Sequence, residues 1–409
     1  MAKLVVIGSG AREHALVRAL RLGGSHRDIV AIPGNPGIAR EARCAPAGSD
    51  LAAAALAERP DLVVVGPEAP LAEGLADKLR AAGVPCFGPS QAAARIESSK
   101  AFAKEVMLAA GVPTAAAQVF DDREGAKAYA TRAGACVVKL DGLAAGKGVV
   151  VADDGQAAAA AVDELYKPGA RILVEERLTG PELSVIALCD GTHVLPLPAA
   201  RDHKRLLDGD LGPNTGGMGA VCSPKDATPA IIEEAVMTVL LPTVQELASR
   251  GIPFVGALYA GLMLTPRGIR VLEFNCRLGD PEAQAILLRL RSDPLPLFLS
   301  AAQGKLHEHR ALWDARTAVA VVAAAHDYPA TPRQGDEIEG LEAVVESEDL
   351  WLLHAGTTLR DGRVVTAGGR VLTVAALGDD AEAARKRAYA ALSRIRFDGM
   401  QVRSDIAAT

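Results

Sequence analysis

The stretch KLDGLAAGKG, residues 139–148, carries three glycines and two lysines and lies between two short apolar runs. The runs over 136–139 and 149–152 predict strands, so the stretch predicts a glycine-rich turn that joins two strands. It is not a Walker loop, because three residues rather than four separate its first glycine from the Gly-Lys pair. Glycine also follows that pair, where a Walker loop has Ser or Thr. Such a turn can fold over phosphates as a mobile flap. The alternative is a flexible hairpin with two solvated lysines.

The first hundred residues, which precede this stretch, alternate strand and helix signals. Alternation of this kind predicts a parallel sheet with helices on both faces, and ligands bind beyond the carboxyl ends of its strands. Three turns fall at such ends, namely 8–10, 33–35 and 66–68. The predicted strands cover 4–7, 29–32, 62–65 and 86–88, and the predicted helices cover 13–22 and 71–82.

The turn GSGAREH, residues 8–14, begins like a dinucleotide-binding fingerprint. Glu13 occupies the third glycine position, and no acidic residue closes the second strand where a ribose contact is expected. Backbone N–H groups at a strand-to-helix turn favour an anion, and Arg12 adds a positive charge. A phosphate or phosphosugar therefore suits this turn better than NAD does. The alternative is an ordinary tight turn with a surface arginine.

A third stretch, VLEFNCRLGDPE over 271–282, predicts a strand with two oxygen ligands. Side chains alternate along a strand, so Glu273 and Asn275 should share one face, together with Val271. Carboxylate and amide oxygens suit Mg²⁺. Arg277 would share that face if the strand continued, close enough to neutralise a transferring phosphoryl group. The alternative is a polar strand face in water.

The rest of the chain carries weaker signals. Residues 207–219 form a long polar stretch that predicts an irregular loop, and ordered loops of this length are often functional. A catalytic role for His203 is no better supported than a hydrogen-bonding one. Ser98 or Ser99 could cap a helix over 101–110. Further strands are predicted at 171–176, 183–189, 257–264, 269–275, 317–325, 343–346 and 371–376, and further helices at 229–250 and 380–395.

Composition limits the classes of function. The chain has 409 residues, 49% of them hydrophobic and 23% charged, and a formal net charge of −6. That charge argues against nucleic-acid binding, and no apolar run is long enough to span a membrane. The six cysteines are far apart and form no Cys-x-x-Cys pair, so we expect them to be reduced in a cytoplasmic protein. No signal peptide is expected.

Together these stretches resemble the phosphoribosylamine–glycine ligases of the ATP-grasp superfamily. Leu140 departs mildly from the family pattern, where alanine is usual. The resemblance implies an α/β ATP-grasp fold with an N-terminal Rossmann-like parallel-sheet domain at 1–100, an ATP-grasp domain with a mobile flap at 101–305 and a C-terminal β-rich domain at 306–409. No fused synthetase or transformylase domain is expected. The segments that carry it are 8–14, 33–35, 139–148, 202–205, 212–219 and 277–282.

The resemblance also implies roles for individual residues. ATP would be bound by Lys100, Lys139, Gly142, Gly146, Lys147, Gly148, Glu175, Leu178 and Glu182, with the flap and lysines at the phosphates, backbone groups of Glu175 and Leu178 at adenine and Glu182 at ribose. Mg²⁺ or Mn²⁺ would be held by Glu273 and Asn275. Phosphoribosylamine would lie near Gly10, Arg12, Glu13, His14, Asn35 and Glu68. Glycine and the γ-phosphate would lie near Asp202, Asn214 and Arg277, and the catalytic residues would be Arg277, Lys147 and Asp202.

The implied activity is ATP-dependent ligation of glycine to 5-phosphoribosylamine, in a monomer whose partners are small molecules. Another ATP-grasp ligase acting on a different carboxylate is the nearest alternative. An NAD-dependent oxidoreductase is disfavoured by Glu13, and a non-catalytic nucleotide sensor by the combination of Glu273, Asn275 and Arg277.

Overall fold

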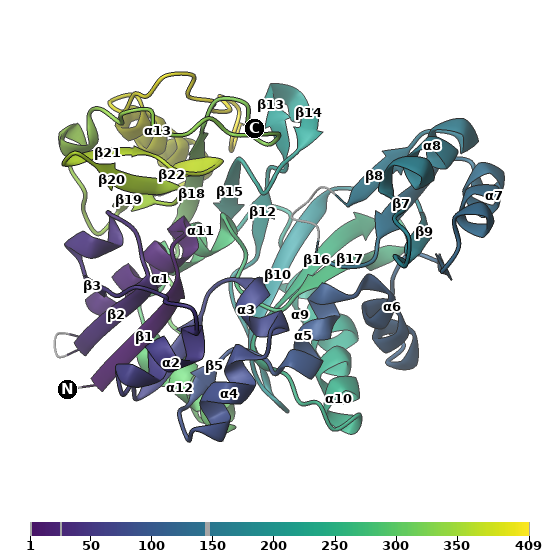
Figure 1. Cartoon of the computed structure of the whole chain (residues 1–409), viewed down its shortest axis with the longest axis horizontal. Coiled ribbons are helices and arrows are strands. Elements are labelled where there is room, and N and C mark those ends of the chain that lie inside the picture. Colours follow the sequence, from purple (N-terminus) through teal and green to yellow (C-terminus); the bar gives the residue numbers. More distant parts are fainter. Residues whose placement is uncertain (1, 25–26, 144–147, 409) are drawn as a thin grey trace.

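The computed structural model describes residues 2–24, 27–143 and 148–408. Figure 1 shows an N-terminal sheet beside a C-terminal β-rich part, a long central sheet, and a small sheet with two helices that projects to one side. The flap positions Gly146 and Lys147 lie outside the described residues.

The N-terminal sheet is parallel throughout, in the order β3-β2-β1-β4-β5. Val5 and Ile7 belong to one hydrophobic core and Leu4 and Val6 to another, so both faces of β1 are buried. This explains the unbroken apolar run that predicted the strand. The strands are β1 (Ala2–Gly8), β2 (Arg27–Pro33), β3 (Arg43–Cys44), β4 (Leu62–Val65) and β5 (Cys86–Phe87).

The predicted helices of this part are present with one correction. The predicted helix over 71–82 is two helices, because Gly74 adopts φ +81° between them. Ser99 caps the next domain's first helix, its hydroxyl accepting from the Phe102 N–H at 3.2 Å. The helices are α1 (Ala11–Leu22), α2 (Leu51–Ala57), α3 (Glu68–Ala72), α4 (Leu75–Ala81), α5 (Gln91–Ser98) and α6 (Lys100–Ala109). Of these, α2 and α5 were not predicted.

The projecting part is an antiparallel sheet in the order β6-β9-β7-β8 with its own hydrophobic core. Strands β7 (Cys136–Leu140) and β8 (Val149–Ala152) pair directly, with Lys139 opposite Val149, so the predicted strand–turn–strand over 139–148 is confirmed at both of its ends. The remaining elements are β6 (Ala117–Phe120), α7 (Arg123–Ala133), α8 (Gly155–Leu165) and β9 (Ile172–Glu176).

A nine-stranded sheet runs from the central part into the C-terminal part without interruption. Its order is β17-β16-β10-β12-β15-β18-β22-β19, with β11 paired to β10, and the pairing of β15 with β18 joins the two parts. The strands are β10 (Glu182–Asp190), β11 (Val194–Pro196), β12 (Ala200–Asp202), β15 (Gly219–Cys222), β16 (Val255–Thr265), β17 (Gly268–Asn275), β18 (Thr317–Ala324), β19 (Leu350–His354) and β22 (Arg370–Gly378).

Helices pack on this sheet, and two of them form one long stretch. The predicted helix over 229–250 consists of α9 (Pro229–Ala235), a π-helical turn (Val236–Leu240) and α10 (Leu241–Ser249). The others are α11 (Glu282–Leu288), α12 (Pro294–Gln303) and α13 (Ala381–Leu392). Within the described part of the chain, no helix has the length and apolar character needed to cross a membrane.

Three sequence-based predictions are corrected. The stretch over 207–219 is not an irregular loop, since β13 (Arg205–Leu207) and β14 (Leu211–Asn214) form a hairpin around a 3₁₀ turn. The predicted strand at 343–346 is absent, and Leu341–Ala343 forms a 3₁₀ turn instead. A further antiparallel pair, β20 (Thr357–Arg360) and β21 (Arg363–Thr366), is joined by Asp361 and Gly362.

The third correction concerns the strand that is predicted to bind a metal ion. Residues 261 and 262 of β16 pair with Glu273 and Val271, so Leu272 is an extra residue in β17. Such a bulge reverses the alternation of side chains. Val271 and Phe274 are therefore both in the hydrophobic core, and the prediction that Val271 shares the face of Glu273 is wrong.

Candidate active site

A buried ion cluster joins the projecting sheet to the central sheet. Nζ of Lys139 lies 2.8 Å from Oε2 of Glu175, and Nζ of Lys104 lies 3.5 Å from the same oxygen. All three side chains are buried. Lys139 also donates to the carbonyl oxygen of Leu272 at 3.0 Å, one residue before Glu273. Two strands of the projecting sheet are thereby fixed against β17.

Burial lowers the pKa of two neighbouring lysines, Lys104 and Lys100. Desolvation lowers the pKa of Lys104 to about 8, although Glu175 opposes the shift. Desolvation also lowers the pKa of Lys100, which donates to the carbonyl oxygen of Gly142 at 2.8 Å. Lys100 therefore contacts Gly142, the first glycine of the predicted flap. Gly148, at the other end of the flap, accepts from the Leu140 N–H at 2.8 Å.

Glu273 lies where several positive charges meet. Partial burial raises the pKa of Glu273, but Lys204, Lys139, Lys100 and Arg277, in that order, outweigh it and the net shift is downward. Nζ of Lys204 lies 3.9 Å from Oε1 of Glu273. Lys100 and Lys139, beside the flap, therefore lie close enough to Glu273 to lower its pKa.

Lys204 also connects Glu273 to the predicted ribose ligand. Its Nζ lies 2.7 Å from Oε2 of Glu182, the first residue of β10. Burial opposes the charge of Lys204, but Glu182 and Glu273 outweigh it and raise its pKa well above the usual value. Leu178, which follows β9, is half-buried and leads into Glu182 through a short turn.

Arg277 is held between two carboxylates. Its guanidinium lies 3.2 Å from Glu68 and 3.2 Å from Glu97. Burial raises the pKa of Glu97, and Arg277 only partly offsets this. Glu97 also accepts from the backbone N–H of Cys276 at 2.7 Å. Arg277 thus links α3 and α5 to the end of β17.

Asp202 is a half-buried residue whose Oδ1 atom is buried and has no hydrogen-bond partner in the described part of the chain. Desolvation, followed by the charge of Glu282, raises the pKa of Asp202 well above its usual value. Glu282 accepts from the Ser184 hydroxyl at 3.0 Å, and that hydroxyl lies 2.8 Å from the Tyr259 hydroxyl. An unpaired buried acceptor of this kind is suited to a ligand that brings a positive charge or a donor.

The loop that follows Asp202 is closely packed against it. Gly217 has φ +109°, and a Cβ there would lie 2.6 Å from Oδ1 of Asp202. Asn214, by contrast, is exposed on β14 opposite Arg205. His203 is a half-buried residue whose pKa is lowered chiefly by desolvation, and its backbone N–H donates to Gly219.

The glycine-containing turn at the N-terminus is occupied by its own glutamate. The N–H of Gly10 donates to Oε2 of Glu13 at 2.6 Å, so the glutamate half of a capping box is present at the start of α1, and Gly10 has no side chain for the other half. Arg12 donates to Oε1 of Glu13 at 2.7 Å and to the carbonyl of Leu278 at 3.1 Å. Arg12 therefore contacts the residue that follows Arg277. The Gly10 N–H, one of the groups expected to bind an anion, is already bonded to Glu13.

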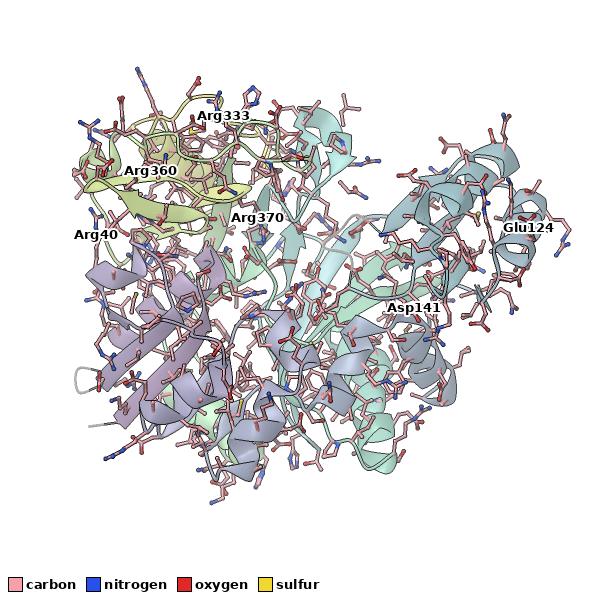
Figure 2. The ribbon with its side chains drawn as sticks, in the orientation of Figure 1. Arg40, Glu124, Asp141, Arg333, Arg360 and Arg370 are labelled. Carbon is pink, nitrogen blue, oxygen red and sulfur yellow. The ribbon has the colours of Figure 1, made fainter. Side chains whose placement is uncertain are left out.

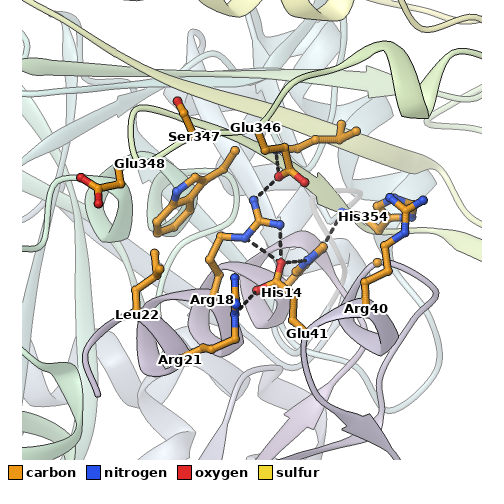
Figure 3. Close-up of a pocket in the computed structure, with 13 residues that line it drawn as sticks. His14, Arg18, Arg21, Leu22, Arg40, Glu41, Glu346, Ser347, Glu348 and His354 are labelled. Carbon is orange, nitrogen blue, oxygen red and sulfur yellow. Dashed lines mark hydrogen bonds and ion pairs between the residues drawn. The ribbon is translucent and has the colours of Figure 1, made fainter. Parts of the chain in front are cut away.

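His14 and Asn35 face the C-terminal part. His14 lies 3.1 Å from Glu41 and its Nδ1 accepts from the His354 N–H at 2.8 Å. Asn35 donates to the carbonyls of Ser9 and His354, both at 2.8 Å. Figure 3 shows His14 and His354 beside a pocket of about 350 Å³ that α1 shares with residues 346–354. Asn35 therefore joins the turn at Ser9 to the end of β19, and the described contacts of His14 are with Glu41 and His354.

Comparison with known proteins decides the family. The models of the phosphoribosylglycinamide synthetase N domain, ATP-grasp (A) domain and C domain match residues 2–97, 98–283 and 318–409. The phosphoribosylamine–glycine ligase of Streptomyces coelicolor is 52% identical over 414 residues, which cover 99% of each chain. The chain belongs to the phosphoribosylglycinamide synthetase family. Like the other members it is an ATP-dependent carbon–nitrogen ligase.

Two further relatives of this synthetase agree. The phosphoribosylamine–glycine ligase of Ralstonia nicotianae is 48% identical over 99% of this chain and 98% of its own length. The crystal structure of the Thermotoga maritima phosphoribosylamine–glycine ligase superposes with a TM-score of 0.84 at 32% identity, covering 99% of this chain and all of that one. The family resemblance, the ATP-grasp fold and the enzyme class predicted from the sequence are confirmed.

Several residues of the synthetase site had no individual prediction. Lys104, Glu97 and Lys204 each supply a charged contact described above, and Arg370 adds another. Arg370 lies 3.0 Å from Asp280 and donates to its carbonyl. Figure 2 shows Arg370 where the C-terminal part meets the central strands. Of these residues, Lys204 lies in the segment 202–205, and Asp280, the partner of Arg370, lies in the segment 277–282. The others lie in none of the segments that carry the resemblance.

Proposed function

We propose that this synthetase joins glycine to 5-phosphoribosylamine through glycyl phosphate, in purine biosynthesis. The glycine carboxylate attacks the γ-phosphorus of ATP, and ADP leaves. The amine of phosphoribosylamine then attacks the acyl carbon, phosphate leaves, and glycinamide ribonucleotide is released. The names of the full-length relatives support these substrates.

The observation that carries this proposal is the convergence of lysine charge on Glu273. An anionic carboxylate must approach an anionic phosphate in the first step, so cations and fixed positions must offset the repulsion. Lys139 and Lys100, together with Gly142 and Gly148, are proposed to bind phosphate oxygens, and their charge and contacts near Glu273 support this. Gly146 and Lys147, which lie outside the described residues, are proposed for the same role from the family resemblance alone. Glu175 and Leu178 are proposed for adenine and Glu182 for ribose.

The residues present fit a divalent ion. Glu273 has a half-exposed carboxylate whose nearest cation is 3.9 Å away, and Asn275 follows at the end of the same strand. This donor set of hard oxygens suits Mg²⁺ or Mn²⁺. A bound ion would neutralise charge on the transferring phosphoryl group.

The acceptor side is proposed around Arg277, Asp202 and the N-terminal turn. Arg277 is proposed as a catalytic residue that offsets charge at the γ-phosphate, and Lys147 as a second. The unpaired Asp202 carboxylate is proposed to bind the ammonium group of glycine, with Asn214 nearby after closure of its hairpin. Arg12 and Glu68 both approach Arg277, which supports phosphoribosylamine binding there, with Gly10, Glu13, His14 and Asn35 shaping the turn.

Organisation and setting are also proposed. We infer three domains, at 1–100, 101–305 and 306–409, a division supported by the three matched segments. The protein is proposed to act as a cytoplasmic monomer. All six cysteines are free thiols, which supports a reducing compartment.

Substrate omission tests the reaction. Freshly generated phosphoribosylamine, glycine and ATP are combined with Mg²⁺, and ADP is measured by a coupled assay while glycinamide ribonucleotide is measured by mass spectrometry. Both products should accumulate only when glycine and phosphoribosylamine are present together. ADP release with another carboxylate but not with glycine would favour a different ATP-grasp ligase, and ATP binding without any turnover would favour a nucleotide sensor.

A further inference from the structure

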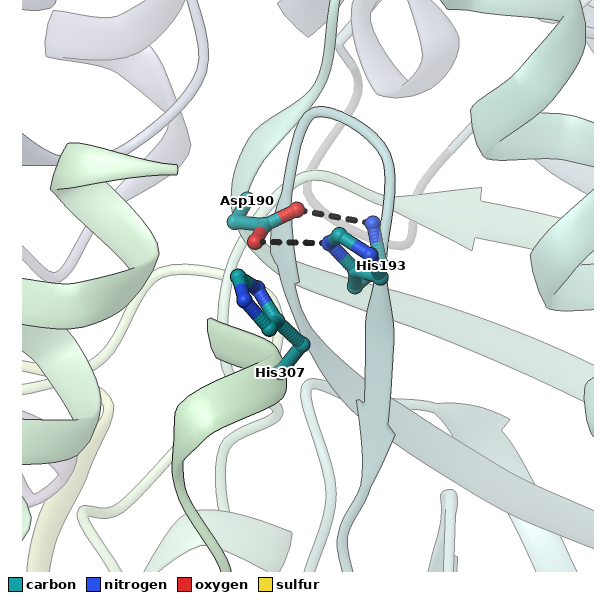
Figure 4. A group of neighbouring side chains, drawn as sticks. All are labelled: Asp190, His193 and His307. Atoms are coloured by element: carbon teal, nitrogen blue, oxygen red, sulfur yellow. Dashed lines mark hydrogen bonds and ion pairs between the residues drawn. The ribbon is translucent and has the colours of Figure 1, made fainter. Parts of the chain in front are cut away.

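A group of potential metal ligands lies at the far end of β10 from the active site. Glu182 begins the strand and Asp190 ends it, so the two are about 26 Å apart at the usual rise per residue. Asp190 lies near His193, in the turn between β10 and β11, and near His307, in the 3₁₀ turn Leu306–Glu308. Figure 4 shows both imidazole rings next to the Asp190 carboxylate.

The carboxylate is held in a fixed position. The Asp190 side chain is fully buried, and its Oδ1 accepts from the N–H of Thr192 at 3.0 Å and the N–H of His193 at 2.7 Å. Its Oδ2 accepts from the Leu306 N–H at 3.0 Å. These bonds tie the turn to a segment more than a hundred residues further along the chain, so the carboxylate is in place before any ion arrives.

The two histidines supply the mobile part of the group. Their side chains are about half exposed, at 49% for His193 and 54% for His307, and their ring centroids are 4.8 Å apart. One potential ligand atom from each of the three residues lies within 4.8 Å of the other two. Within the described ranges, this is the one group of three such residues that meets this distance.

One pair of the potential ligand atoms has the spacing found on a tetrahedral ion. Ligand atoms on zinc at their usual bond lengths are about 3.3 Å from one another. Nδ1 of His193 is hydrogen-bonded to Oδ2 of Asp190 at 3.1 Å, a separation close to that value, and the potential ligand atom of the exposed His307 lies within 4.8 Å of both. Glu308, 3.9 Å from Nε2 of His307, adds negative charge beside the site. Two imidazoles and one carboxylate suit zinc better than Mg²⁺.

We propose that Asp190, His193 and His307 form a binding site for one zinc ion, with water as the fourth ligand. The ion would join the β10–β11 turn to the segment after α12, remote from the ligase chemistry. The site is separate from the Glu273–Asn275 donors and does not depend on the proposed reaction.

Isothermal titration calorimetry of the full chain with zinc, in buffer that contains millimolar Mg²⁺, tests the site. His193→Ala and His307→Ala should each lose one equivalent of zinc binding or weaken it at least about a hundredfold, since even partners behind a ligand are worth 10–100-fold. His326→Ala is the matched control, because His326 is also exposed and lies 2.9 Å from a carboxylate, that of Asp327. It should bind zinc as the parent does.

Ligase activity and X-ray absorption complete the test. All three variants should retain the parent's activity with Mg²⁺, and the zinc spectrum of the parent should contain two imidazole ligands. The proposal fails if the parent binds no zinc at this ratio, or if both histidine variants titrate like the parent. Zinc that remains in the variants at a second stoichiometric step would belong to another site, and only the step that disappears counts as support.

Discussion

Lys139 and Glu175 form a buried ion pair, with 2.8 Å between Nζ and Oε2, although they lie on adjacent strands of the projecting sheet. The same lysine donates to the carbonyl of Leu272 in the central sheet. The positive charge proposed to bind ATP phosphates is therefore already positioned in the free protein, against the strand that carries Glu273. Four predictions follow from this and related contacts.

Replacing Lys139 should weaken ATP binding. Lys139→Met removes a charge-assisted contact to phosphate, so the KM for ATP should rise by about 10- to 100-fold. Lys127→Met is the control, since Lys127 is on the same part of the chain and is ion-paired with Asp163 at 2.7 Å, but is exposed. Steady-state kinetics with varied ATP measures both variants. Equal KM values in the two would contradict the role of Lys139.

Replacing Glu273 should remove turnover and leave the fold intact. The Glu273 side chain is 39% exposed and its closest ion-pair contact is 3.9 Å long, so its truncation leaves no buried cavity. Glu273→Ala should lower glycine-dependent ADP release at least about a hundredfold, as expected for loss of a metal ligand. Glu337→Ala, which removes an exposed partner of Arg363, should retain activity. Near-normal turnover of Glu273→Ala at ordinary Mg²⁺ would disprove its ligand role.

A methyl group at Gly217 should disturb Asp202. Gly217→Ala places a Cβ nearest to Cδ of Pro281 and 2.6 Å from Oδ1 of Asp202, at φ +109°. Gly209→Ala also places an alanine at positive φ, +67°, but its Cβ meets open space. Each variant should lose about 1–2 kcal/mol of stability from backbone conformation, and Gly217→Ala should lose more and also lower kcat. Thermal unfolding and kinetics separate the two effects; identical behaviour of the variants would show that Asp202 tolerates the contact.

Acidification should destabilise the contact between the N-terminal and C-terminal parts. Burial lowers the pKa of His354 to about 3, from 6.5. Between pH 6.5 and pH 3, His354 is therefore protonated in the unfolded chain but not in the folded chain. The free energy of unfolding falls as the pH drops through this range. The Glu41 carboxyl, with a pKa of about 2, does not contribute until the pH is below about 4.5.

His354→Asn should therefore reduce the fall in melting temperature between pH 7 and pH 5, because an amide can occupy the position of Nδ1 near Thr357 without titrating. His326→Asn, at an exposed histidine, serves as the control. The buried His14, whose pKa is also lowered by burial, should leave part of the pH effect in place. An unchanged pH dependence in His354→Asn would exclude the proposed cause.

Local signals predicted most of the framework. The apolar runs of β1 and β4 and the hairpin of β16 and β17 are recognisable from neighbouring residues alone. The hairpin of β13 and β14 is different, because its strands are exposed and its turn is held by distant residues. Gly209 donates to Asp405 at 2.8 Å, across nearly two hundred residues. No local sequence pattern predicts that contact. The same is true of the bulge in β17 that points the Val271 side chain towards the hydrophobic core.

The same distinction applies to the active site. Residues inside glycine-rich or acidic motifs could be assigned from the sequence, whereas Lys104, Glu97 and Arg370 stand alone there. Each gains its meaning from a partner supplied by another element, such as Asp280 for Arg370. A buried lysine cannot be distinguished in sequence from the many solvated ones, since burial is a property of the packed chain.

The pairing of β15 with β18 has a practical consequence for dissecting the molecule. A truncated chain that stops before Thr317 would leave one side of β15 without its antiparallel neighbour, and unpaired strand edges promote aggregation. The segment matched by the C-domain model therefore cannot simply be cut away to leave a soluble nucleotide-binding fragment. Co-expression of the two pieces, with strand pairing re-formed between separate chains, is the more promising design.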